Sequence, residues 1–160
     1  MFLSAFTLMI SCGDSEKKEK DDVTIGDYST PAPKKETQAT NSKDMVDFSN
    51  KGIGPVKSIN ITDDIDQALA VKGKTVFDNM CTACHKLDKK YIGPALADVT
   101  ERRSAEWIMN MILNPEEMIA KDPIAKQLLV ESNMAVMANQ NLKEDEARAI
   151  LESFRSLPNE

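Results

Sequence analysis

The sequence predicts an all-α domain of four or five short helices. Aromatic residues make up 5% of the 160 residues, which is less than β-sandwiches and barrels normally contain. Apolar residues in 62–160 recur mostly at spacings of three, four and seven, the period of a helix with one buried face. Apolar residues make up 41% of the whole chain, which is sufficient for one modest core but not for two. We therefore expect a single helical domain over residues 62–160.

Two helices are predicted before Pro115. The first follows Asp63 and Asp64, whose carboxylates can cap its start. Its apolar positions are Ile65, Leu69, Val76, Phe77 and Met80. The second covers residues 105–113 and has Trp107 on its apolar face, and the proline ends it.

Two further helices are predicted after that proline. Pro123 suits the first position of a helix that continues to about residue 130, because the N–H that proline lacks would be unpaired there anyway. The last predicted helix covers residues 144–157. Its apolar stripe consists of Ala147, Ile150, Leu151, Phe154 and Leu157.

The first eleven residues carry no charged side chain and end at Cys12, after which the composition becomes strongly charged. This pattern resembles a bacterial lipoprotein signal, although a secretory signal normally begins with Lys or Arg. The resemblance implies that residues 1–11 are removed and that Cys12 carries a lipid anchor on the periplasmic side of a bacterial membrane. The alternative is a buried N-terminal helix or strand in which the cysteine is incidental.

Residues 12–61 are expected to form a flexible tether. The segment contains three prolines, nearly balanced charge and no sustained helical or alternating pattern, so it cannot bury enough apolar surface to offset its ordering entropy. A few apolar residues near its end can still lie against the domain. These are Met45, Val46, Phe48, Ile53, Val56 and Ile59.

Charge and ligand counts exclude several function classes. The net charge of -6 argues against a nucleic-acid partner, which would require a basic face. The longest apolar runs fall short of the roughly 18 residues of a membrane-spanning helix. The chain contains one histidine, His85, so a site with two histidine ligands cannot be built from this chain alone.

Residues 81–85 read Cys-Thr-Ala-Cys-His, the signature of covalent haem attachment. Thiols at Cys81 and Cys84 can reach the two vinyl groups on one porphyrin edge, and the adjacent His85 can bind the iron. Three alternatives use the same cysteines. A thioredoxin-like dithiol needs a preceding strand, a structural zinc site needs four ligands, and a disulfide leaves the histidine without a role.

Three sequence blocks resemble the class I cytochrome c family. They are Gly73-Lys74-Thr75-Val76-Phe77, Tyr91-Ile92-Gly93-Pro94, and the segment from Met137 to Ala147. The resemblance implies the cytochrome c fold around one covalently bound haem c with its iron. It also implies that the first and last helices cross, and that the Gly-Pro turn accepts a hydrogen bond from His85 Nδ1. Gly73 suits such a close helix crossing because a glycine within a helix otherwise costs about 1 kcal/mol relative to alanine.

The second iron ligand is expected to be a methionine. Of the nine methionines, Met134 and Met137 lie in the loop before the last helix. The family resemblance favours Met137 by its register, five residues before Leu142. The family usually has proline after its ligand, whereas this chain has Ala138, so Met134 stays open as the alternative. An open or lysine-bound iron is the remaining possibility.

Two groups of residues are candidates for roles beside the haem. Trp107, through its indole N–H, or one of the arginines 102 and 103 can bind a haem propionate; plain core packing is the alternative for the tryptophan. Lys86, Lys89 and Lys90 follow the haem motif closely, and a basic rim there can steer an acidic partner. Ordinary solvated surface is the alternative for the lysines.

The leading hypothesis is therefore a single-haem electron carrier without catalysis of its own, with His85 and Met137 as iron ligands and Pro94 and Trp107 beside the haem. Its expected partners are a donor such as a quinol-oxidising complex and an acceptor that is a terminal reductase or oxidase. One rival is a haem-based ligand binder or sensor with a displaceable methionine. Another is a dithiol redox protein without haem.

Overall fold

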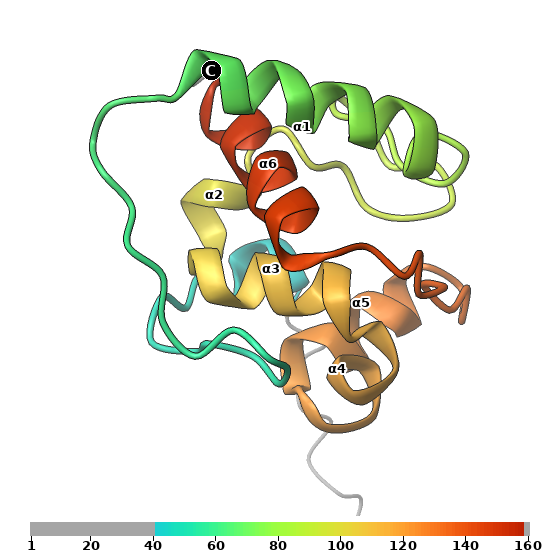
Figure 1. Ribbon diagram of the computed structural model, residues 1–160. Helices are drawn as coiled ribbons and strands as arrows, with labels where there is room; N and C mark the ends of the chain where they lie inside the picture. Colours follow the sequence, from blue (N-terminus) through green and yellow to red (C-terminus); the bar gives the residue numbers. More distant parts are fainter. Residues whose placement is uncertain (1–40, 159–160) are drawn as a thin grey trace, which may run out of the picture. The chain divides into compact units, whose positions relative to one another are not determined.

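The computed structural model describes residues 41–158, and within this range the protein is helical and contains no strand (Figure 1). The helices are α1 (Gln67–Met80), α2 (Val99–Arg102), α3 (Ala105–Leu113), α4 (Pro115–Lys121), α5 (Pro123–Glu131) and α6 (Glu144–Arg155), and a 3-10 turn, η1 (Ser42–Asp44), precedes them. The all-α prediction is confirmed. Within the described range no helix is both long enough and apolar enough to cross a membrane.

The helix count exceeds the predicted four or five because two short helices were not distinguished in the sequence. The four residues of α2 are too few for an apolar period to be visible. Pro115 ends α3, as predicted, but it also occupies the first position of α4. Only Asn114 separates the two helices, and its backbone leaves the helical conformation at φ -142° and ψ 55°.

Side-chain caps define where the longer helices begin. Ser104 accepts from the Trp107 N–H at 3.2 Å at the start of α3, and Asp122 accepts from the Ala125 N–H at 2.8 Å at the start of α5. The predicted starts of α3 and of the helix at Pro123 are confirmed. The start of α1 differs from the prediction, because its cap is Asp66, which accepts from the N–H of residue 69 at 2.9 Å. The helix therefore begins after residues 63–65, not among them.

Helices α1 and α6 cross at Gly73, as the family resemblance implied (Figure 1). A Cβ at this position would overlap the carbonyl of Ala149 and come within 2.7 Å of the Ile150 N–H nitrogen. One turn later, Phe77 meets Phe154 edge to face with ring centroids 5.5 Å apart. Both helices turn their apolar faces toward the same core.

Residues 41–61, which we call the strap, were predicted to belong to the tether but pack against the helices. The fully buried Asn110 of α3 donates to the carbonyls of Lys51 and Val56 and accepts from the Val56 N–H at 2.9 Å. Ser42 donates to both carboxylate oxygens of Glu131 on α5. The packed region thus begins at least twenty residues before the predicted boundary. The predicted signal, Cys12 and residues 13–40 lie outside the described residues.

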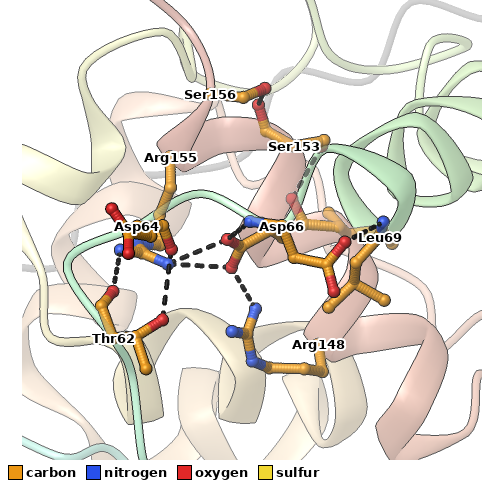
Figure 2. A network of polar contacts seen from close by, with 10 residues as sticks. Thr62, Asp64, Asp66, Leu69, Arg148, Ser153, Arg155 and Ser156 are labelled. Atoms are coloured by element: carbon orange, nitrogen blue, oxygen red, sulfur yellow. Dashed lines mark hydrogen bonds and ion pairs between the residues drawn. The ribbon is translucent and has the colours of Figure 1, made fainter.

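A buried carboxylate joins the start of α1 to α6 (Figure 2). Glu152 is 1% exposed and accepts from Arg148 at 2.5 Å, from Arg155 at 2.9 Å and from the Asp66 N–H at 2.9 Å. Arg155 also donates to the Thr62 carbonyl at 2.6 Å. Burial alone would raise the pKa of Glu152, but these hydrogen bonds and charges outweigh it and lower the pKa below its usual value.

Replacing Glu152 with Gln should lower the free energy of unfolding at pH 7 by about 1–3 kcal/mol, because two arginines lose their charged partner. A lowered carboxyl pKa stabilises the fold above the ordinary glutamate value of about 4.3, and this contribution is lost as the pH falls through the lowered pKa. The difference between E152Q and wild type should therefore shrink on acidification. Denaturant unfolding of both proteins at pH 7 and at pH 3 measures this difference in the free energy of unfolding. As a control, D145N removes the exposed Asp145–Lys72 pair and should change little at either pH.

Candidate haem site

A cavity of about 210 Å³ lies between the end of α1, residues 92–96, helices α3 to α6 and the loop before α6. Its walls are mostly apolar. All six residues assigned to the cofactor from the sequence line it, namely Cys81, Cys84, His85, Pro94, Trp107 and Met137. The fold thus brings residues more than 50 positions apart to one site.

The two motif cysteines stand where α1 ends. Cys81 is the C-cap residue, and its carbonyl accepts from the N–H groups of Cys84 and His85 at 3.1 and 2.9 Å, which winds the motif into a tight turn. Both thiols are free, so they do not form a disulfide. Burial, with a smaller contribution from Cys84, raises the pKa of Cys81 to about 11. This thiol is therefore protonated at neutral pH, unlike the attacking thiolate of a thioredoxin-type dithiol.

The surroundings of the cysteines also differ from those of the two alternative sites. Within residues 41–158 no three His, Cys, Asp or Glu side chains are grouped to hold a metal ion. The motif follows a helix rather than a strand. A structural zinc site and a thioredoxin-like dithiol are therefore not supported by the described part of the chain.

The His85 imidazole is held by the Gly-Pro turn. Nδ1 lies 3.2 Å from the Pro94 carbonyl, which can only accept, so Nδ1 carries the proton and Nε2 keeps its lone pair. Burial lowers the pKa of His85, and the hydrogen bond to Pro94 offsets part of this effect. The imidazole is therefore neutral at pH 7, which is the form that binds a metal. Gly93 lies against the ring, where a Cβ would overlap the imidazole.

The two candidate methionines lie in different environments. Met137 is half-buried and lines the cavity together with Ala138. Met134 is 62% exposed, has a backbone φ of 63° and does not line the cavity. The loop between α5 and α6 therefore offers Met137, and not Met134, to the cavity.

Trp107 is 3% exposed and contributes its ring to the cavity wall. Its indole N–H donates to Asp122 at 3.2 Å rather than to a group in the cavity. The arginines likewise have partners within the protein: Arg102 donates to Asp98 at 2.5 Å, and Arg103 donates to backbone carbonyls, so these contacts do not single out one propionate donor. Arg102 and Arg103 both line the cavity. Arg103 lies over the Trp107 ring, 5.4 Å from its centroid, and donates to the Ser42 carbonyl of the strap at 2.7 Å.

Asp122 is a buried residue that the sequence analysis did not assign to the site. It is 2% exposed and accepts from the indole of Trp107, from the Ala125 N–H and from Asn50 of the strap at 2.7 Å. Its position directly before a helix-initiating proline was the available signal, because Asp is favoured as an N-cap. Its contact with the tryptophan depends on how α3 and α5 pack.

Two of the three lysines after the motif make contacts within the protein. Lys86 lies 5.3 Å from the Tyr91 ring centroid and donates to the Thr82 carbonyl at 3.0 Å. Lys90 donates to the Glu131 carbonyl, and Lys89 is exposed. Tyr91 and Ile92, which neighbour them, are also exposed. The positive charges therefore stand beside exposed apolar side chains next to the haem motif.

These features fit a covalently attached haem. Two free thiols stand at the edge of an apolar cavity, a neutral imidazole adjoins them, and a thioether enters from a separate loop. A flat apolar macrocycle requires such walls, and its ionised propionates require nearby donors such as the two arginines. No residue in the cavity wall contradicts this group.

The cytochrome c family model matches residues 70–157. Among solved structures, the cytochrome c from Rhodothermus marinus is 44% identical, with a TM-score of 0.62 over 73% of this chain and 93% of its own. An engineered form of that cytochrome is 43% identical with the same TM-score. Another engineered form, bound to a carbene intermediate, is 44% identical with a TM-score of 0.59. No curated protein gives a significant match.

The family match extends over more than half of the chain, from the first turn of α1 to just beyond α6, and so includes the whole cavity. The Rhodothermus marinus cytochrome agrees with it in both sequence and fold. The chain therefore belongs to the cytochrome c family, and its cofactor is a covalently bound haem c.

Proposed function

We propose that this protein is a single-haem electron carrier in which His85 and Met137 would hold the iron of the haem. Proteins of the cytochrome c family are generally electron carriers. The observation that supports the ligand pair is that both side chains line one cavity, whereas the exposed Met134 does not. Bound haem c supplies reversible one-electron chemistry through its iron.

The residues of this chain have three tasks in that function. The Pro94 carbonyl orients the His85 ring and increases its basicity as a ligand. The apolar walls keep water from the centre of the cavity. A thioether from Met137 favours the reduced state and raises the reduction potential. With the iron held by both of these side chains, a substrate would find no free ligand position on it, so we propose no enzymatic activity.

The surface beside the haem motif is the proposed docking site for redox partners. Exposed Tyr91 and Ile92 provide apolar contact, and Lys86 and Lys89 provide positive charge in an otherwise acidic protein. Such charge speeds the encounter with an acidic partner and makes it salt-dependent. The proposed donor is a quinol-oxidising complex, and the proposed acceptor is a terminal reductase or oxidase.

We further propose attachment through a lipid on Cys12 at the periplasmic face of a bacterial membrane. The support is the uncharged stretch that ends at this cysteine and the charged, proline-containing segment that follows. Tethering would confine the haem domain near membrane-bound partners and raise its effective concentration.

A second candidate function is a haem-based ligand binder or sensor, in which Met137 is displaced. It is favoured by Ala138, which stands where the family usually has a more rigid proline. The two functions differ in the role of Met137: in the carrier it would stay bound to the iron, and in the ligand binder it would be absent from the iron or readily displaced.

The Met137→Ala substitution should abolish the thioether-to-iron absorption band of the oxidised protein and lower the reduction potential, because a neutral sulfur ligand is lost. Met134→Ala should leave both unchanged, since that side chain faces solvent. Absorption spectra and redox titrations of the two variants measure this. The reverse pattern would assign the ligand to Met134, and a wild-type spectrum without the band would favour the ligand binder.

Replacing either Cys81 or Cys84 with Ala should leave a single thioether bond and lower the yield of stable holoprotein, and replacing both should leave no covalent haem. Haem staining after denaturing electrophoresis measures the attachment. His85→Ala should retain the thiols but impair folding of the holoprotein, because the iron loses one ligand. Full haem staining in the double cysteine variant would contradict the proposed attachment.

Cells fed a labelled fatty acid should transfer the label to the wild-type protein and not to a Cys12→Ser variant, because the thiol is the acceptor of the lipid. The Cys12→Ser protein should also leave the membrane fraction. A wild-type protein without label would rule out the anchor while leaving the electron-transfer proposal intact.

A further inference from the structure

We propose that Asn139 is a positioning residue that holds Met137 at the iron by joining the ligand loop to the end of α3. The inference rests on the proposed role of Met137. Asn139 thereby controls how often the methionine leaves the iron. It also controls how readily small nitrogenous ligands such as imidazole reach the iron.

Residues 136–142 make few hydrogen bonds to the rest of the described chain. Their hydrogen bonds are mostly internal: Gln140 donates to the Ala138 carbonyl, and the Asn141 N–H donates to Asn139 Oδ1 at 2.8 Å. The one hydrogen bond from residues 136–142 to another part of residues 41–158 joins Asn139 Nδ2 to the Leu113 carbonyl at 3.4 Å. Asn139 lies two positions after Met137, so this bond acts close to the ligand.

The acceptor is well placed for this role. Leu113 is the last residue of α3, so its carbonyl has no partner inside the helix. In Figure 1 the chain leading into α6 passes beside this end of α3. Both polar atoms of the Asn139 amide are therefore engaged. The oxygen accepts a hydrogen bond within the loop, and the nitrogen donates one to the end of α3.

The end of α3 is itself fixed from outside. Asn114 donates to the Ile53 carbonyl of the strap at 3.2 Å, and Asn110 binds the strap through three hydrogen bonds. Leu113 lies between these two anchors in the sequence. The loop is therefore fastened to a helix end that the strap holds in place.

The consequence is an equilibrium between a closed loop, with Met137 on the iron, and an open loop. An external ligand binds only the open form, so its apparent affinity rises in proportion to the open fraction. Loss of one modest hydrogen bond should raise that fraction about two- to tenfold.

The test is imidazole binding to the oxidised holoprotein in Asn139→Asp and in a matched control, Asn141→Asp. Both variants make the same amide-to-carboxylate change. Asn139→Asp keeps the oxygen that accepts from the Asn141 N–H but loses the donor to Leu113, whereas the Asn141 side chain is exposed. Imidazole should bind about two- to tenfold more tightly to Asn139→Asp than to wild type. Asn141→Asp should remain within twofold of wild type.

The same measurement in a Met137→Ala background separates this inference from the proposed function. If Asn139 acts through Met137, Asn139→Asp should have no effect once the methionine is absent. An equal effect in both backgrounds, or none in the wild-type background, would overturn the role of Asn139. If Met137→Ala itself neither opens the iron to imidazole nor removes the thioether band, the proposed ligand is wrong, independently of Asn139.

Discussion

The close crossing of α1 and α6 is the contact on which the haem site depends. It requires Gly73, because a side chain there would overlap the backbone of α6. The crossing brings Phe77 against Phe154 and leaves both rings on the cavity wall. It also fixes the direction in which α1 ends, and that end carries Cys81. A loose crossing would therefore displace the haem attachment motif as well as the core.

Buried polar side chains connect the remaining parts to this framework. Glu152 secures the start of α1, Asp122 joins the strap to Trp107 and α5, and Asn110 fastens the strap to α3. Each is at most 2% exposed and has hydrogen-bond partners. An unpaired polar group in these places would be costly, so the partners specify one arrangement as well as stabilising it. These three residues therefore support the cavity walls without lining the cavity themselves.

Local chemistry explains which features were predictable from the sequence. The Cys-x-x-Cys-His motif, the prolines at 115 and 123 and the apolar stripe of the last helix are each contained in a short segment. Their effect depends on covalent spacing, a fixed φ or helical period, and none of these requires a distant partner. The same signals missed α2, which is shorter than one apolar repeat, and placed the start of α1 too early.

The sequence by itself determined the helical class, the cofactor motif and the pair of methionines available as a second ligand. The tertiary structure decided that the strap belongs to the packed domain, that Asp66 rather than Asp63 or Asp64 caps α1, and that Met137 rather than Met134 lines the cavity. In each case the deciding partner is far away in the sequence or depends on how a loop turns. The strap has too little apolar periodicity to fold alone and is ordered by the buried amide of Asn110. Only the folded helices bring that partner into reach.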